Sequence, residues 1–169
     1  MTAQSEYRGK YLQDHFKIIS SPSDGNCLFH SIATGLNQNS SSSNKSSSNH
    51  LQVRKEIVNW IKNNLETKVD GLEFKLAIFL NEGETVSDYL KALEKEGSYG
   101  DFCNIVAMSR VRPGTQFKIF LVEGSSSSGK KIIKAEIEVN PEDGVAVTSD
   151  ICLAYDEQKQ HYDLLIPTH

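Results

Sequence analysis

One cysteine stands at the junction of a polar turn and an apolar segment, and its position suggests nucleophilic chemistry. The residues Asp24, Gly25 and Asn26 precede Cys27, and an apolar run over 28–36 at helical spacing follows it. The pattern predicts that Cys27 lies in the first turn of a helix. Unpaired N–H groups and the helix dipole favour negative charge there. We therefore expect a lowered thiol pKa and a reactive thiolate.

The turn before this cysteine has the residues that an oxyanion hole needs. Gly25 permits a positive φ in a tight turn, and the side chains of Asp24 and Asn26 can bind nearby backbone groups. The N–H of Cys27 and those of the loop 24–26 can then point into one concavity, where they would stabilise a developing oxyanion. We expect Asp24 to brace this loop or to line the hole.

A candidate base lies near the other end of the sequence. His161 and Asp163 are two residues apart in an apolar run, and residues i and i+2 of a strand project from the same face. The carboxylate would then accept one imidazole N–H and fix the tautomer, while Tyr162 would face the apolar layer. From these residues alone, a polar strand end is an equally good interpretation. Together with Cys27, however, they indicate a thiol hydrolase whose site is assembled in space.

The remaining cysteines and histidines have less chemical context. Cys103 and Cys152 lie in apolar segments, where we expect structural roles. His30 follows Cys27 by one helical turn and is expected to be a packing or rim residue. Three cysteines without Cys-x-x-Cys spacing favour a reducing compartment over a disulfide framework. No Cys/His group has zinc-site spacing, so we expect no metal and no cofactor.

Composition narrows the function class further. The 169 residues carry a net charge of −4 and no basic stripe, which argues against nucleic-acid binding. No apolar run approaches the roughly 18 residues of a membrane span, and the N-terminus lacks an apolar signal segment. We expect an intracellular, cytoplasmic monomer that does not contact membranes.

The periodicity predicts helices first and strands later, which is an α+β arrangement. Residues 1–15 are expected to be a polar lead-in, and the Ser/Asn-rich residues 37–49 a mobile loop. Ser87 is the expected N-cap of one helix and Asp101 that of another. The expected helices cover 27–35, 51–65, 74–79, 87–96 and 101–108, and the expected strands 117–122, 132–139, 151–155 and 162–166, after a short apolar stretch at 16–19.

Four segments resemble the ovarian-tumour (OTU) family of cysteine proteases, which are mostly deubiquitinases. DGNCLFHSI is similar to the family's nucleophile motif and HYDLL to its histidine motif. HLQVRKEIVNWIKNN is similar to its Leu-Arg helix, and YLKALEKEGSYGD to the segment before its Trp-Gly turn. The resemblance covers about 16–166. It implies one catalytic domain over 16–169 with a papain-like OTU fold, in which helices flank a small, mostly antiparallel sheet.

The resemblance also implies roles for single residues. Cys27 would be the nucleophile, His161 the general base and Asp163 the orienting acid. Asp24 matches the motif aspartate, which sometimes supplies the acidic group itself, so which aspartate dominates stays open. The implied reaction is hydrolysis of the peptide or isopeptide bond after the terminal glycine of ubiquitin, or of polyubiquitin, through a thioester on Cys27.

The same resemblance implies where the ubiquitin tail would bind. Tyr99, Gly100, Asp101 and Tyr162 are the expected substrate-binding residues, since the 98–102 turn and the loop before His161 can form the walls of a narrow groove. Tyr99 replaces the Trp that is usual in the family, and His30 stands where Arg or Tyr is common. Charged residues that could meet a basic tail, although most such residues are only solvated, are Glu123, Asp156 and Glu157.

Several alternatives stay open at this point. The chain could be a weakly active ubiquitin-binding module, or a protease for another ubiquitin-like modifier. It could also be a different thiol enzyme, such as an acyltransferase or amidase, or a structural domain with fortuitous motifs. A pathogen or symbiont source would place its action in the host cytosol.

Overall fold

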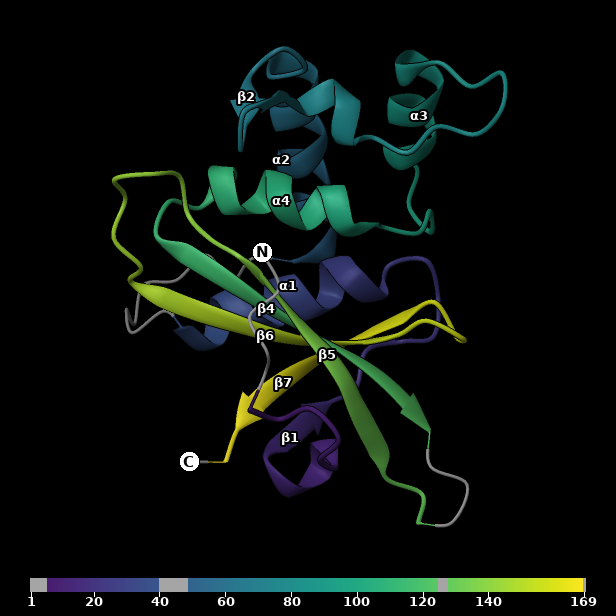
Figure 1. Ribbon diagram of the computed structural model, residues 1–169. Coiled ribbons are helices and arrows are strands. Elements are labelled where there is room, and N and C mark those ends of the chain that lie inside the picture. Colours follow the sequence, from purple (N-terminus) through teal and green to yellow (C-terminus); the bar gives the residue numbers. More distant parts are fainter. Residues whose placement is uncertain (1–5, 40–48, 125–127, 169) are drawn as a thin grey trace.

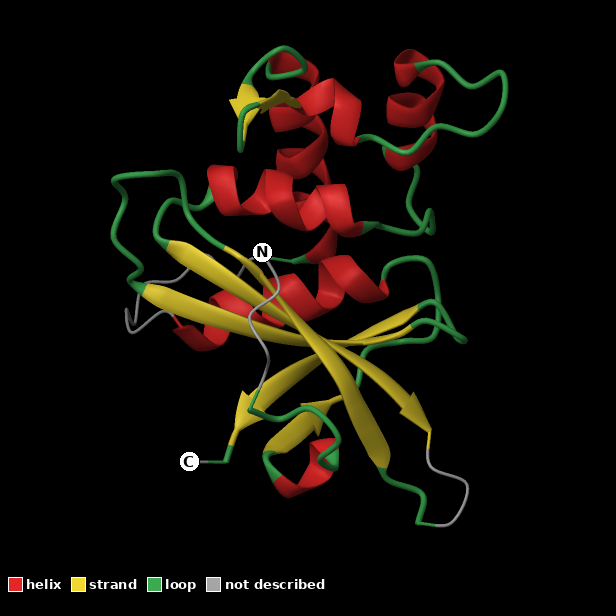
Figure 2. Cartoon of the chain, viewed as in Figure 1, coloured by secondary structure: helices red, strands yellow, loops and turns green. Residues whose placement is uncertain are grey.

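The centre of the protein is a five-stranded sheet. A computed structural model describes residues 6–39, 49–124 and 128–168 (Figure 1). The strand order is β1-β7-β6-β4-β5, and Figure 2 draws the strands in yellow. The strands are β1 (Phe16–Ile19), β4 (Thr115–Gly124), β5 (Lys131–Val139), β6 (Ser149–Asp156) and β7 (His161–Pro167).

Pairing in this sheet is antiparallel except at one place. β1 pairs with β7, β7 with β6, and β4 with β5 in antiparallel register, whereas β4 and β6 are parallel. The predicted α+β class with a mostly antiparallel sheet is thus confirmed. The β6–β7 hairpin places Asp156 directly opposite His161.

The α-helices lie on one face of the sheet (Figure 1). Helix α1 packs against β6 and β7, and α2 contacts both α1 and α4. Among the described residues, no helix is long and apolar enough to cross a membrane. The helices are α1 (Cys27–Asn39), α2 (His50–Asn63), α3 (Val86–Leu93) and α4 (Phe102–Val111), with short 3-10 helices η1 (Leu12–Asp14) and η2 (Phe74–Ala77).

Alternation along the strands divides the core into two layers. In β4, Phe117 and Ile119 pack in the helix-side core, while Phe120 packs in a smaller cluster on the opposite face. Leu12 is fully buried in that smaller cluster, and the Tyr7 ring lies 5.4 Å from that of Phe16. The polar segment before residue 16 is therefore attached to the sheet through a few apolar side chains.

Three elements differ from the sequence-based expectation. Helix α1 continues past Gly35 to Asn39, and Asn49 already caps α2, so only residues 40–48 of the expected loop fall outside the described residues. The expected helix at 74–79 is the 3-10 helix η2, preceded by a hairpin of β2 (Lys68–Val69) and β3 (Leu72–Glu73). The N-cap of α3 is Thr85 rather than Ser87, because Thr85 forms a reciprocal capping box with Asp88.

Candidate active site

The loop before α1 is held by its own backbone and by Asp24. The Asn26 N–H donates to Asp24 Oδ1 over 2.9 Å, and the Cys27 N–H donates to the Asp24 carbonyl over 3.3 Å. Asp24 therefore braces the loop, which is one of the two roles expected for it. Two of the N–H groups expected to form an oxyanion hole are engaged within the loop in this structure.

Gly25 is needed for a close approach and not for a positive φ. A Cβ at this position would lie 1.5 Å from the carbonyl oxygen of Gly97, and the φ of Gly25 is not in the left-handed region. The expectation of a positive φ was wrong, because contact with the 97–100 turn, rather than local turn geometry, excludes a side chain here. The turn before Cys27 and the turn that carries Tyr99 are consequently in direct contact.

Arg54 of α2 joins these two turns through hydrogen bonds. Its guanidinium donates to the carbonyl oxygens of Gly25 (3.3 Å) and Ser98 (2.8 Å), and to Asn26 Oδ1 (2.8 Å). It also stacks over the Phe29 ring, with the guanidinium carbon 4.0 Å from the ring centroid. Arg54 is only 3% exposed. The sequence signal for this role is a charged residue on the apolar face of a helix, between Val53 and Ile57.

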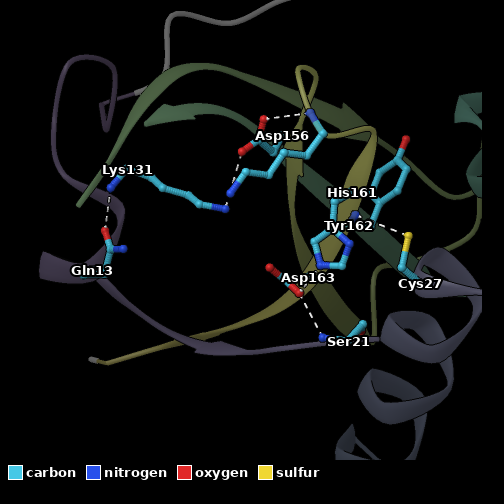
Figure 3. A network of polar contacts seen from close by, with 9 residues as sticks. Gln13, Ser21, Cys27, Lys131, Asp156, His161, Tyr162 and Asp163 are labelled. Atoms are coloured by element: carbon cyan, nitrogen blue, oxygen red, sulfur yellow. Dashed lines mark hydrogen bonds and ion pairs between the residues drawn. The ribbon is translucent and has the colours of Figure 1, made fainter. Parts of the chain in front are cut away.

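The start of β7 supplies the second half of the site. His161 Nε2 lies 2.8 Å from Asp163 Oδ1, and the Ser21 N–H donates to the same oxygen over 2.9 Å (Figure 3). A carboxylate only accepts hydrogen bonds, so Nε2 carries the proton and Nδ1 of the neutral ring is left as an acceptor. The side-by-side placement expected for His161 and Asp163 is the one observed, and Tyr162 points into the helix-side core as expected.

Cys27 meets β7 at the same point. The Tyr162 N–H donates to Cys27 Sγ over 3.5 Å, so the thiol lies against the backbone between His161 and Asp163 (Figure 3). Burial raises the pKa of Cys27, and the N–H groups of Tyr162 and Leu28 lower it only in part. The expectation of a lowered pKa was thus wrong for the free protein, because desolvation outweighs the helix N-terminus.

The 98–102 turn stands beside this centre. Tyr99 is 57% exposed, and a Cβ on Gly100 would lie 2.6 Å from Leu28 Cδ2, so the backbone at Gly100 is as close to α1 as it can be. The Asp101 carboxylate is already engaged: it accepts from the Asn104 N–H as the expected N-cap and from the Tyr89 hydroxyl. Asp101 therefore shapes the turn, whereas the side chains of Tyr99 and Phe102 face solvent.

A buried carboxylate on β6 was not recognised as part of this region. Asp156 is 4% exposed and accepts from the Lys159 N–H over 3.3 Å, while the Lys131 ammonium lies 3.6 Å from its second oxygen (Figure 3). The expectation that Asp156 is one of the charged residues that could meet a basic tail is therefore wrong, because the residue is covered. The sequence signal for this burial is that β6 carries apolar side chains on both of its faces, so that a residue at its end is also covered.

A family model identifies the class of this arrangement. The model for the OTU-like cysteine protease matches residues 22–162, which include the Cys27 loop and the start of β7. The chain belongs to the OTU family of cysteine proteases. No curated protein matches it by sequence.

Solved structures show that the OTU fold extends over nearly all of the chain. The OTU of Hazara virus bound to ubiquitin is 20% identical with a TM-score of 0.66, and the match covers 99% of this chain and 88% of that one. The OTU domain of OTUD1 is 20% identical, with a TM-score of 0.60 and coverages of 92% and 89%. An OTU deubiquitinase from Wolbachia pipientis bound to ubiquitin is 12% identical, with a TM-score of 0.57 and coverages of 91% and 97%.

Proposed function

We propose that this OTU-family protein is a deubiquitinase that hydrolyses the peptide or isopeptide bond after the terminal glycine of ubiquitin. The observation that carries the proposal is the contact of the Cys27 thiol with β7 beside the hydrogen-bonded pair of His161 and Asp163. Ubiquitin as the partner is supported by the ubiquitin-bound OTU structures from Hazara virus and Wolbachia. The proposed place of action is the cytoplasm, where such conjugates occur.

The raised pKa of Cys27 favours a general-base mechanism. In this mechanism Nδ1 of His161 accepts the thiol proton as Sγ attacks the carbonyl carbon, and Asp163 stabilises the imidazolium that forms. The tetrahedral intermediate then collapses. The C–N bond breaks, the imidazolium gives its proton to the departing amine, and the acyl group stays on Cys27 as a thioester. His161 next deprotonates a water molecule, whose oxygen attacks the thioester and releases the ubiquitin carboxylate and the thiol.

The oxyanion would be stabilised by N–H groups of the loop 24–27. Because Asp24 engages those of Asn26 and Cys27 in the free protein, we propose that substrate binding releases them from Asp24. The dominant acidic residue would then be Asp163, which contacts His161 directly, and Asp24 would act by setting the loop conformation.

The tail of ubiquitin would pass between the 98–102 turn and the β6–β7 hairpin. Its two terminal glycines carry no side chains, which suits a passage along the backbone of Gly100, a residue that lines a cavity there. Tyr99 on one side and Gln160 on the other line the cavities at both ends of this passage. Tyr162 would contribute to this passage through its backbone, while its buried ring supports the hairpin from the core.

Hydrolysis of ubiquitin–aminocoumarin tests this proposal, followed by a panel of di-ubiquitins. We expect release of the fluorophore by the wild-type protein and none by Cys27→Ala at equal concentration. Fluorophore release that survives in Cys27→Ala would contradict the assignment. Cleavage of another modifier's aminocoumarin conjugate instead would keep the chemistry and change the substrate.

A further inference from the structure

Two cavities lie on opposite faces of the sheet at the end of the β6–β7 hairpin. The first has a volume of about 540 Å³ and the second about 420 Å³. Tyr99 and Gln160 line both. A substrate that crosses the passage between these two residues would occupy one cavity with its acyl part and the other with its leaving group.

If the proposed function holds, the position of His161 determines which cavity binds the acyl part of the substrate and which binds the leaving group. His161 and Asp163 line the first cavity, whereas Tyr162 lines the second. The group that protonates a leaving amine must lie within hydrogen-bond reach of it. The leaving amine, and the protein to which it belongs, therefore fit the first cavity.

Charge is compatible with this direction. The second cavity is lined mainly by apolar and aromatic side chains and by no lysine or arginine, so a basic ubiquitin tail meets no repulsion there. The first cavity has charges of both signs, from the ammonium groups of Lys131 and Lys159 and the carboxylates of Asp24 and Asp163.

The two lysines are organised by one buried carboxylate. Asp156 accepts from the Lys159 N–H through Oδ1 and faces the Lys131 ammonium through Oδ2 at 3.6 Å. Among the residues that the structure describes, no carboxylate lies within 4.0 Å of the Lys159 ammonium. Asp24 and Asp163, which also line this cavity, already accept backbone N–H groups.

We propose that the first cavity is a leaving-group subsite that binds an acidic side chain next to the ubiquitin-bearing lysine of the conjugated protein. Lys159 pairs with this carboxylate, and Lys131 adds a second positive charge. Asp156 holds the backbone of the hairpin turn that carries Lys159, and its cross-strand position opposite His161 keeps the subsite beside the group that protonates the leaving amine.

Isopeptide substrates test this subsite directly. Ubiquitin is joined to the lysine of short peptides that differ only in their flanks, which are Asp/Glu, Ala or Lys, and kcat/KM is measured for each. The variants are Lys159→Glu and, as a matched control, Lys91→Glu, since Lys91 lies on α3 and lines neither cavity. Each value is divided by kcat/KM on ubiquitin–aminocoumarin, which carries no peptide on the leaving side, to correct for folding.

We expect the wild type to prefer the acidic over the Lys flank by about threefold, as for a partly exposed ion pair. Lys159→Glu should reverse this preference, so that the ratio changes about tenfold, and Lys91→Glu should keep the wild-type ratio. Equal rates on all flanks, or a ratio that Lys159→Glu leaves unchanged, would overturn the subsite while the deubiquitinase assignment stands. Absence of hydrolysis on every substrate, aminocoumarin included, would overturn both.

Discussion

Cys27 and Cys103 occupy similar places in two helices but have different surroundings. Cys27 is the first residue of α1 and Cys103 the second of α4, and both are nearly inaccessible. The Cys27 sulfur accepts a hydrogen bond from the Tyr162 N–H, whereas the Cys103 thiol donates to Asp101 Oδ1 over 2.9 Å. Donors around a sulfur favour the thiolate, and a carboxylate next to it favours the thiol.

The comparison teaches that a helix N-terminus alone does not make a nucleophile. Burial raises the pKa of both thiols, and the Asp101 carboxylate raises that of Cys103 further. The pKa of Cys152, on the opposite face of the sheet, is raised to about 11, with burial as the largest cause. What distinguishes Cys27 is its contact with β7 beside the His161–Asp163 pair, and each prediction below tests that distinction.

The largest expected effect comes from removing one thiol or the other. Cys27→Ala should lower kcat/KM on ubiquitin–aminocoumarin by at least about ten-thousand-fold, as for loss of a covalent nucleophile, while ubiquitin binding measured by calorimetry is retained. Cys103→Ala should keep activity within about threefold, with a cost in unfolding free energy of about 1 kcal/mol for the lost hydrogen bonds. A Cys103→Ala protein that is folded but inactive would remove the distinction between the two thiols.

The two aspartates come next. Asp163→Asn should lower kcat by about a thousandfold, because an amide in place of the carboxylate no longer fixes the His161 tautomer. Asp24→Asn should cost about tenfold, since the amide oxygen can still accept the Asn26 N–H. Steady-state kinetics of the two variants answer the question that the sequence left open. A larger loss in Asp24→Asn would transfer the acidic role to Asp24.

Arg54 supports the Cys27 side, and Tyr89 supports the Cys103 side. Arg54→Met leaves buried carbonyl oxygens without a donor and should lower the unfolding free energy by about 3 kcal/mol, together with a lower kcat. Tyr89→Phe removes a neutral hydroxyl from Cys103 and Asp101 and should cost about 1 kcal/mol with kcat retained.

Urea denaturation measures the change in unfolding free energy, and steady-state kinetics measure the change in kcat. Arg54→Lys is the matched control, since it keeps the charge but cannot span both turns. A fully active Arg54→Met protein would show that the link between the two turns is purely structural.

The last prediction concerns pH. The raised pKa of Cys27 means that the thiolate is a minor species at neutral pH, so alkylation by iodoacetamide should rise about tenfold per pH unit from pH 6 upward. Cys103 should stay unmodified over the same range. The rate is followed by intact mass and assigned by peptide mapping. A pH-independent rate down to pH 6 would indicate a preformed thiolate–imidazolium pair instead of a general base.

The sequence predicted what depends on local pattern. The strands, the helix after Cys27 and the pairing of His161 with Asp163 follow from periodicity and from the geometry of residues i and i+2. The link between Gly25 and Gly97 could not be foreseen, because it depends on the contact of segments about seventy residues apart. The raised pKa of Cys27 had the same origin: the helix start is visible in the sequence, but the burial that outweighs it comes from tertiary packing.

The role of Asp156 shows a second limit. Its charge suggested an exposed loop residue, whereas the register of β6 and β7 and the approach of Lys131 from β5 place it under cover. Arg54 shows a related limit, since its place in the helix is visible in the sequence but the contact of its guanidinium with two turns is not. Both residues were visible as charges on buried faces, which is the pattern most worth examining in such a sequence.

The most direct test of the central claim uses ubiquitin with a C-terminal thiol-reactive warhead. The folded, reduced protein is mixed with the probe, and the mass of any adduct and the modified peptide are measured. We predict one ubiquitin per chain, attached at Cys27, and no adduct with Cys27→Ala. An adduct on Cys103, or no adduct on folded wild-type protein, would contradict the assignment of Cys27 as a ubiquitin-directed nucleophile.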